Sequence, residues 1–333
     1  MKIVVDDKIP YIHETLAKLA DEVVYLKGSQ IKAEDVKDAD ALIVRTRTRC
    51  DERLLKDSKV QFVATATIGY DHLDTTWLEQ NGIEWTNCPG CNSGSVAQYI
   101  ESVLLNLPPS TFHLPPSTLG IVGCGHVGSK VCKVGERLGM RVLVNDPPLE
   151  KRIQNRDWRM VSLETIAQEA DIITFHVPLN ETTQYLANKT FFQRLKKKPV
   201  IINSSRGGVV DEQALLQALD NGTVSRAVID TWENEPAISR TLLYRAFIGT
   251  PHIAGYSADG KVNADNMVVE ALCRHFSLPL PEKIVAPKLP DGFKYTGHPL
   301  ELYNVMNDSE KLKTHPEMFE ELRGNYPLRR ESS

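Results

Sequence analysis

Three polar residues in the second half of the chain have the side chains needed to oxidise a 2-hydroxy acid. Arg206 lies in Asn-Ser-Ser-Arg-Gly-Gly, Glu235 in Trp-Glu-Asn-Glu-Pro and His252 in Thr-Pro-His-Ile-Ala-Gly-Tyr, each just beyond a predicted strand. A guanidinium binds a planar carboxylate through two parallel hydrogen bonds. A histidine accepts a hydroxyl proton near neutral pH, and a carboxylate beside it orients the ring. An exposed arginine, a turn glutamate and an ordinary histidine remain the alternative, which spacing alone leaves open.

A second group of residues is typical of a dinucleotide-binding turn. Gly123, Gly125 and Gly128 form a G-x-G-x-x-G pattern between a predicted strand, Leu119–Val122, and a predicted helix, Val127–Leu138. The first glycine permits a tight turn, the second lets amides approach a pyrophosphate, and the third allows close helix–strand packing. The helix N-terminus then offers its free amides to the anion.

Asp146 is expected to choose between the two nicotinamide dinucleotides. It lies 18 positions beyond Gly128, at the end of the next predicted strand. A carboxylate there accepts hydrogen bonds from the adenosine ribose and repels a 2′-phosphate, so NAD is predicted rather than NADP. A glycine turn without a cofactor is the alternative.

Short apolar runs alternate with amphipathic stretches along most of the chain, which is typical of parallel sheets covered by helices. The predicted strands are Ile3–Val5, Glu22–Tyr25, Ala41–Val44, Phe62–Ala66, Leu119–Val122, Arg141–Val144, Ile172–Phe175, Val200–Asn203, Ala227–Ile229 and Phe247–Gly249. The predicted helices include Ile12–Leu19, Leu54–Asp57 and Ser95–Leu107. We therefore predict an α/β fold with two Rossmann-like, doubly wound parallel-sheet domains.

A proline-rich connector is predicted between the two domains. Leu-Pro-Pro-Ser-Thr occurs at 107–111 and again at 114–118, and a proline pair cannot continue a helix. The helix before it is therefore expected to end at Asn106. The residues beyond about Val285 are too few for a core of their own, although Glu317–Leu322 is amphipathic, so this tail is expected to pack on the body or on a partner subunit.

The composition argues against several classes of protein. Lys and Arg number 39 against 43 Asp and Glu, a net charge of −4, so nucleic-acid binding is not expected. No apolar run approaches a membrane span, and Met1–Asp7 becomes acidic too early for a secretory signal. Six cysteines are too few for a disulfide framework, so a soluble, cytoplasmic protein is predicted. Cys88 and Cys91 lack a second pair at zinc-site spacing, so no metal is predicted, with metal or redox chemistry at this pair as the alternative.

Together these motifs resemble those of the D-isomer-specific 2-hydroxyacid dehydrogenases, in that family's order and over nearly the whole chain. The segments that carry the resemblance are Gly123–Gly128 with Asp146, Ser204–Gly207, Trp232–Pro236 and Pro251–Gly255. The resemblance implies that Arg206, Glu235 and His252 are the catalytic residues. It also implies cofactor contacts, with Thr174 on the adenosine side and Asp230 on the nicotinamide side. The implied cofactor-binding residues are Gly123, Gly125, His126, Val127, Gly128, Asp146, Thr174, Ser204, Ser205, Arg206, Asp230 and Gly255.

Further segments resemble the branch of that family that oxidises 4-phospho-D-erythronate in pyridoxal 5′-phosphate (vitamin B6) biosynthesis. They are Met1–Pro10, Val44–Thr46, Thr65–Thr67, Asp71–Asp74, Pro89–Asn92, Asp146–Pro148, His252–Tyr256 with Gly260 and Lys261, and Leu322–Tyr326. This resemblance implies that Thr46, Thr67 and Tyr256 contact the substrate, that the cofactor is NAD, and that the chain forms a homodimer. From the residues themselves, Arg45, Arg47 and Arg49 follow a strand end and offer an anion site, with a solvated basic edge as the alternative for Arg47 and Arg49.

The expected domain bounds follow from the same resemblance. Residues 1–94 with about 255–285 form a flavodoxin-like substrate-binding domain, 95–254 an NAD-binding Rossmann domain, and 286–333 an abbreviated dimerisation segment. Two other functions stay open. One is a D-2-hydroxyacid dehydrogenase for 3-phosphoglycerate or an unphosphorylated acid. The other is a non-enzymatic NAD-sensing protein, since this fold also serves transcriptional corepressors.

Overall fold

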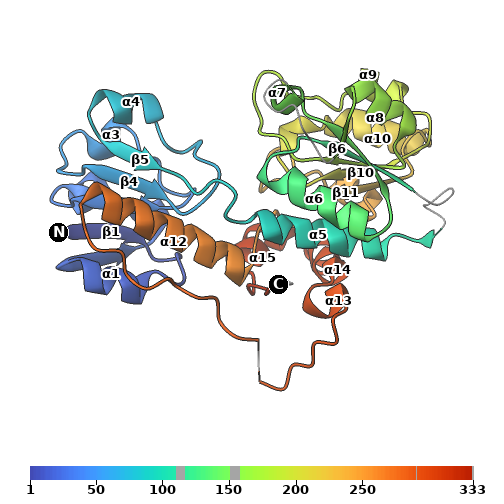
Figure 1. Cartoon of the computed structure of the whole chain (residues 1–333). Coiled ribbons are helices and arrows are strands. Elements are labelled where there is room, and N and C mark those ends of the chain that lie inside the picture. The colour runs from blue at the N-terminus through green and yellow to red at the C-terminus, as the bar shows by residue number, and fades with distance from the viewer. Residues whose placement is uncertain (110–116, 151–157, 290, 332–333) are drawn as a thin grey trace. The chain divides into compact units, whose positions relative to one another are not determined.

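The chain forms two compact units, shown in Figure 1. A computed structural model describes residues 1–109, 117–150, 158–289 and 291–331. Unit 1 comprises Met1–Asn92 and Ser257–Asp291, and unit 2 comprises Ser93–Tyr256 and Gly292–Ser333. The predicted connector at 107–118 falls largely outside the described residues.

Unit 1 is built on a five-stranded, fully parallel sheet with strand order β2-β1-β3-β4-β5. This is the order of flavodoxin-like folds. The strands are β1 Lys2–Asp6, β2 Glu22–Leu26, β3 Ala41–Val44, β4 Phe62–Thr65 and β5 Glu84–Thr86. The helices are α1 His13–Leu19, α2 Ala33–Val36, α3 Glu52–Leu55, α4 Thr75–Gln80 and α12 Ala258–His275, with a 3-10 turn at Gly28–Gln30.

The core of unit 1 lies on both faces of this sheet. Successive residues of β1 alternate between two apolar clusters: Ile3 and Val5 belong to one, and Val4 to the other. Val268 and Leu272 of α12 fill the first cluster, so a helix from late in the chain covers the face of strands from its beginning. Burial on both faces explains why the strands are continuous runs of apolar residues.

Unit 2 is built on a seven-stranded parallel sheet with order β12-β11-β10-β9-β6-β7-β8. The strands are β6 Thr118–Val122, β7 Arg141–Asn145, β8 Arg159–Met160, β9 Ile172–Phe175, β10 Val200–Asn203, β11 Arg226–Ile229 and β12 Ile248–Gly249. Numbered from β6, this is the 3-2-1-4-5-6 Rossmann order with one strand added. In such a sheet ligands bind where the order reverses, here at the carboxyl ends of β6 and β9.

Helices cover both faces of the second sheet. They are α5 Ser93–Asn106, α6 His126–Arg137, α7 Pro147–Glu150, α8 Leu163–Glu169, α9 Lys189–Gln193, α10 Glu212–Asp220, α11 Arg240–Arg245, α13 Pro299–Leu302, α14 Val305–Thr314 and α15 Phe319–Gly324, with 3-10 turns at Gly207–Val209 and Pro316–Met318. The predicted doubly wound α/β architecture is confirmed, and α5 ends at Asn106 as expected. β5 and β8 were not predicted. Both are short and partly polar, so neither shows the apolar run that identified the other strands.

The tail beyond residue 291 belongs to the same compact unit as the dinucleotide-type sheet. Val305, Leu312 and Phe319 are fully or almost fully buried in the two apolar clusters of unit 2. The segments of the two units end at 92, 256 and 291, whereas the expected domain segments end at 94, 254 and about 285. The apolar residues of the tail therefore pack on the body of unit 2, and its role as a dimerisation segment stays a prediction.

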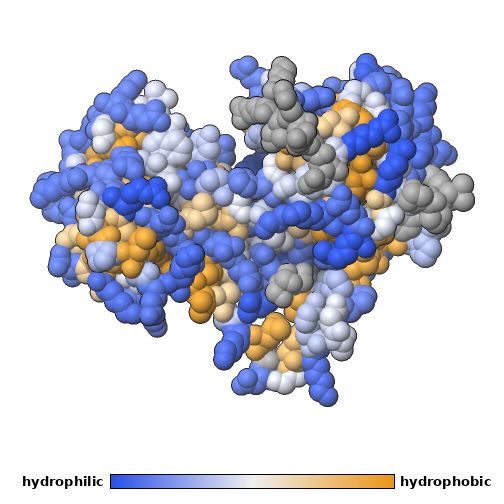
Figure 2. Space-filling view, in the orientation of Figure 1, coloured by the Kyte–Doolittle hydropathy of each residue, from blue (hydrophilic) through white to orange (hydrophobic). Residues whose placement is uncertain are grey.

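Hydrophilic residues cover most of the visible surface in Figure 2, with apolar residues in separate patches. Within the described residues, no helix is long and apolar enough to cross a membrane. All six cysteines, including Cys88 and Cys91, are buried free thiols. The described residues contain no group of three potential metal ligands.

Candidate active site

The glycine turn lies between β6 and α6, and its three glycines meet different surroundings. Gly123 has φ +91°, and a Cβ there would lie 2.5 Å from a backbone oxygen. A Cβ on Gly128 would lie 2.0 Å from the Gly123 oxygen, whereas one on Gly125 would meet nothing within 4 Å. The first and third glycines are therefore required by the protein's own packing. The space in front of Gly125, beside the exposed His126 and the half-buried Val127 of the first helical turn, fits an approaching anion.

Asp146 lies directly after β7 and accepts two backbone hydrogen bonds. Its Oδ2 accepts from the Cys124 amide at 2.7 Å, and its Oδ1 accepts from the Leu149 amide at 2.8 Å. The carboxylate thus braces the glycine turn and the start of α7 at the same time. Each oxygen keeps a second lone pair that can accept from the ribose hydroxyls of a dinucleotide.

Further predicted cofactor residues lie at the carboxyl ends of β9 and β10. The Thr174 hydroxyl shares a 3.0 Å hydrogen bond with Nε2 of His176, whose pKa burial lowers to about 3. Ser205 is tied to Asn203 through its amide and its hydroxyl. By contrast, the Ser204 hydroxyl oxygen is buried and has no partner among the described residues. A buried hydroxyl without a partner suits a ligand, so Ser204 fits the cofactor edge of the sheet better than Thr174 does.

Glu235 and His252 are in direct contact. Nδ1 of His252 lies 3.0 Å from Oε1 and 2.8 Å from Oε2 of Glu235, and the Trp232 amide donates to Oε1 at 3.0 Å. Burial raises the pKa of Glu235, but the His252 hydrogen bond and charge, the Trp232 amide and Arg323 outweigh it and lower the pKa below its ordinary value. The ionised carboxylate therefore fixes the proton of the imidazole on Nδ1 and leaves Nε2 free to accept another.

Arg206 lies three residues after β10 and is half-buried. Its Nη1 donates to the Ser205 carbonyl at 2.8 Å, and its own carbonyl accepts from the Asn203 side chain at 2.9 Å. The next residue, Gly207, ties this turn to the loop of Glu235, because a Cβ at Gly207 would lie 2.1 Å from the Trp232 oxygen. The strand ends thus bring the Arg206 turn against the loop that carries the carboxylate.

Asp230 is almost completely buried and holds the loop that carries His252. Its Oδ1 accepts from the Thr250 hydroxyl at 2.6 Å and from the Ile253 amide at 2.8 Å, and its Oδ2 accepts from the Ala254 amide at 3.0 Å. His252 has φ +56°, a left-handed conformation that is costly for a residue with a side chain. The hydrogen bonds that the loop amides donate to Asp230 offset that cost. Asp230 thus supports the loop of His252. Gly255 directly follows the two residues, Ile253 and Ala254, whose amides bind Asp230.

Two arginines of the tail contact the site: Arg323 contacts Glu235, and Arg329 contacts the loop of His252. The sequence analysis gave neither arginine a role. Arg323 of α15 donates to Oε2 of Glu235 at 3.3 Å. Arg329 is 8% exposed and donates to the carbonyls of Ile253 and Ala254 at 3.1 and 2.6 Å. Arg329 therefore binds the carbonyls of the same two residues whose amides donate to Asp230. No periodic or spacing signal marks these arginines in the sequence.

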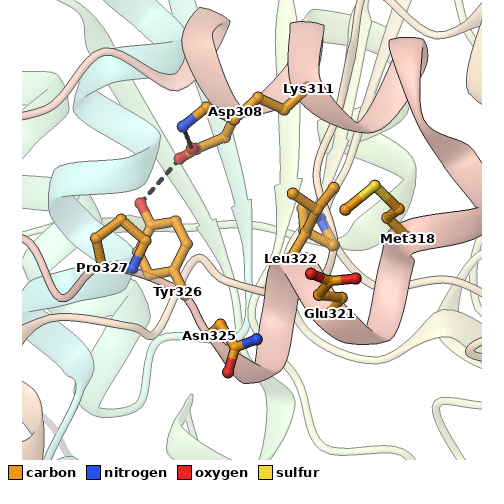
Figure 3. Close-up of a pocket in the computed structure, with 9 residues that line it drawn as sticks. Asp308, Lys311, Met318, Glu321, Leu322, Asn325, Tyr326 and Pro327 are labelled. Atoms are coloured by element: carbon orange, nitrogen blue, oxygen red, sulfur yellow. Dashed lines mark hydrogen bonds and ion pairs between the residues drawn. The ribbon is translucent and has the colours of Figure 1, made fainter.

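In Figure 3 the helices α14 and α15 enclose a small cavity of about 150 Å³ next to Pro251. The Tyr326 hydroxyl donates to Asp308 at 2.8 Å across one side of it, and Glu321 and Leu322 line the other side. The cavity is smaller than a typical ligand pocket. We interpret it as a packing gap behind the candidate site.

Of the predicted substrate residues of unit 1, Arg45 and Thr46 lie where its strand order reverses. Arg45 follows β3, and its guanidinium pairs at 3.3 Å with Asp6, the fully buried last residue of β1. Thr46 is exposed beside it. Thr67, beyond β4, donates to the Gly69 carbonyl at 2.8 Å. The carboxyl ends of β1 and β3 are the edge at which a flavodoxin-like sheet binds ligands.

Thr67 is linked to the buried His72 through the hydroxyl of Thr65. The Thr65 hydroxyl lies 2.7 Å from that of Thr67 and 3.0 Å from Nε2 of His72. Burial lowers the pKa of His72 to about 4, so this histidine is neutral at physiological pH. His72 therefore supports Thr67 through the Thr65 hydroxyl. Arg49 is directed instead to the Asp71 carbonyl at 3.2 Å.

Comparison with known proteins gives consistent results. Residues 107–254 match the family model described as D-isomer specific 2-hydroxyacid dehydrogenase, NAD binding domain. The chain is 54% identical to the erythronate-4-phosphate dehydrogenase of Bacteroides thetaiotaomicron over 99% of this chain and 97% of that one. It is 41% identical to that of Edwardsiella ictaluri, covering 100% and 93% of the two chains. Among solved structures, NAD+-bound 3-phosphoglycerate dehydrogenase from Entamoeba histolytica matches with a TM-score of 0.70 and 28% identity, over 87% of this chain and 99% of that one.

Proposed function

Because the chain belongs to the D-isomer-specific 2-hydroxyacid dehydrogenase family, and within it to the erythronate-4-phosphate dehydrogenases, we propose that it oxidises 4-phospho-D-erythronate with NAD+. The product is (R)-3-hydroxy-2-oxo-4-phosphooxybutanoate, and the reaction serves vitamin B6 biosynthesis. The observation that carries the substrate is 54% identity over 97% of a relative of that name. The contact between Glu235 and His252 carries the chemistry.

The residues of unit 2 divide the work of this oxidation. Arg206 binds the substrate carboxylate through its guanidinium fork. Nε2 of His252 takes the proton of the C2 hydroxyl, and Glu235 holds the ring and stabilises the imidazolium that results. NAD+, when bound, accepts the hydride that leaves C2. The turn at Gly125, the Ser204 hydroxyl and the free lone pairs of Asp146 fit the dinucleotide.

Unit 1 is proposed to supply the groups that recognise the rest of the substrate. Arg45 offers a guanidinium at a ligand-binding sheet edge, with Thr46 exposed beside it and Thr67 at the next strand end. A guanidinium and hydroxyl groups suit a phosphate ester. Because Arg45 already pairs with the buried Asp6, its position is fixed before any substrate arrives. From unit 2, Tyr256 is proposed as a further substrate contact.

The test is turnover with a panel of acids by the purified full-length chain. NADH formation is followed with 4-phospho-D-erythronate, D-erythronate, 3-phospho-D-glycerate and D-lactate. A 2-oxo acid is added as re-oxidant in case the protein retains reduced cofactor. We expect the highest kcat/KM with 4-phospho-D-erythronate. Inactivity with it together with robust turnover of 3-phospho-D-glycerate would refute the substrate assignment.

We also infer a cytoplasmic homodimer. Six buried free thiols suit a reducing compartment, and the family resemblance supports the dimer. Sedimentation equilibrium of the purified chain tests the dimer, and a monomer at micromolar concentration would contradict it.

A further inference from the structure

Arg323 connects the tail of the chain to two residues of the candidate site. It lies in α15, and its side chain is 19% exposed. Nη1 donates to Oε2 of Glu235 at 3.3 Å, and the guanidinium also hydrogen-bonds the Tyr256 hydroxyl. One cation thus joins the carboxylate that orients the base to the tyrosine proposed as a substrate contact.

The hydrogen bonds of Glu235 show what this contact does. Oε1 accepts from the Trp232 amide and lies 3.0 Å from Nδ1 of His252, while Oε2 lies 2.8 Å from the same Nδ1 and accepts from Arg323. The carboxylate therefore divides its charge between the imidazole and a permanent cation. Without Arg323, the full negative charge would favour the imidazolium form of His252. An imidazolium cannot act as a base.

We propose that Arg323 is a positioning residue for the oxidation: it fixes Glu235 and Tyr256 and offsets part of the negative charge that faces His252. This inference rests on the proposed function. A guanidinium suits the role because its fork makes two directed contacts and its charge persists at every accessible pH.

The tail is held firmly enough to place Arg323. The Gly249 amide of β12 donates to the Ser309 hydroxyl of α14 at 3.1 Å. Tyr326, just after α15, donates to Asp308 of α14 and lies with its ring 6.1 Å from that of Tyr256. α15 is therefore fixed both to the strand that precedes His252 and to the tyrosine that follows it.

Other titratable groups interact with these residues and are still present when Arg323 alone is changed. They are Glu212, which interacts with Glu235, Asp230, which interacts with His252, and Glu320, which interacts with Arg323. Glu212 and Asp230 are acidic, so removing Arg323 leaves the pair in a more negative surrounding.

The test compares Arg323→Met and Arg323→Lys with wild type and a matched control. Arg245→Met is the control, because it also removes one positive charge from unit 2 but breaks only an exposed pair with Asp220. In Arg323→Met we expect the acid limb of the kcat/KM profile to move up by about 0.5–1 pH unit, from charge removal at this range. Arg323→Lys keeps the positive charge but loses the two directed contacts of the guanidinium. It should therefore leave the acid limb of the kcat/KM profile in place and lower kcat about tenfold. Arg245→Met should match wild type.

A measurement without turnover separates this inference from the proposed function. The Cε1–H resonance of His252, assigned by its loss in His252→Gln, is titrated by NMR in the free protein. We expect its midpoint to move up in Arg323→Met and to stay in Arg245→Met, whichever acid the enzyme oxidises. If Arg323→Met does not fold, Arg323→Gln is predicted to show the same shift. An unchanged midpoint, or one that moves equally in the control, overturns the proposal.

Discussion

We expect Glu235→Gln to reduce kcat about a thousandfold while leaving NADH affinity unchanged. In wild type, Nδ1 of His252 lies within hydrogen-bond distance of both carboxylate oxygens. In the variant, the Trp232 amide still needs an acceptor, so the amide oxygen stays there and the NH2 group turns towards His252 and Arg323. Nδ1 must then accept a hydrogen bond, and the ring proton moves to Nε2. The nitrogen that should take the substrate proton already carries one.

The magnitude follows from the charge that develops on the imidazole. Unit charges about 4 Å apart attract by about 4 kcal/mol at an effective dielectric constant of 20. That intermediate constant suits side chains that are 26% and 17% exposed, as those of His252 and Glu235 are. Because each 1.36 kcal/mol is about a factor of ten in rate, the lost attraction corresponds to about three factors of ten.

The assay measures kcat from NADH formation at saturating substrate and NADH affinity from its fluorescence. Glu233→Gln is the matched control, because it makes the same chemical change two residues away. Its Oε1 accepts from the Glu212 amide at 3.1 Å, and the glutamine oxygen can replace it. The control should keep kcat within about fivefold. If Glu235→Gln also stayed within about tenfold of wild type with normal NADH affinity, the orienting role would be refuted.

Three further outcomes follow from the same geometry. Gly125→Ala should leave the unfolding free energy within about 0.5 kcal/mol, because its Cβ meets nothing in the protein, yet weaken NADH binding at least roughly tenfold. Gly128→Ala should lose both folding stability and NADH affinity, since its Cβ would lie 2.0 Å from a backbone oxygen. Chemical denaturation measures the stability of the two variants and fluorescence titration their NADH affinity. Equal losses of stability in the two variants would contradict the roles given to these glycines. Arg206→Lys should lower kcat/KM about 10- to 100-fold at unchanged NADH affinity, through loss of the charge-assisted fork, and an unaffected kcat/KM would exclude Arg206 as the carboxylate anchor. Burial raises the pKa of Glu212 from 4.5 to about 7, so the folded state holds the proton more tightly and the unfolding free energy falls, by at most about 3 kcal/mol, as pH rises through that window. Glu212→Gln should remove this fall between pH 5 and 8 in chemical denaturation, and a curve parallel to wild type would count against it.

Much of the fold could be predicted because its signals are local. Gly123 and Gly128 are required by contacts within a few residues, so the turn is visible in the sequence. The ends of parallel strands share one edge of a sheet, so residues just beyond β10, β11 and β12 are expected to gather there. The contact of Glu235 with His252 follows from that rule, although the two residues are 17 positions apart in the chain.

The parts that could not be predicted depend on distant contacts. Arg323 lies 88 positions after Glu235, and Arg329 lies 231 positions after Gln98, the α5 residue it also contacts. The tail's apolar residues give no sign of which face of unit 2 they cover. The hydrogen bond between the Thr174 hydroxyl and His176 depends on side-chain orientation at one strand end. Spacing does not determine that orientation.

The His252 loop is held by Asp230 on its amide side and by Arg329 on its carbonyl side. The positions of these two residues in the chain determine when, during synthesis, the loop can be fixed. Asp230 is synthesised before this loop, but Arg329 follows Ile253 by 76 positions. A ribosome-bound chain therefore contains the glycine turn, Arg206, Glu235 and His252 well before the arginine that holds the loop's carbonyls is made. Dinucleotide binding can mature during translation, whereas a properly held base comes only after the tail has emerged and packed beneath it. Catalytic competence thus requires the tail as well as the strand ends that carry the site residues.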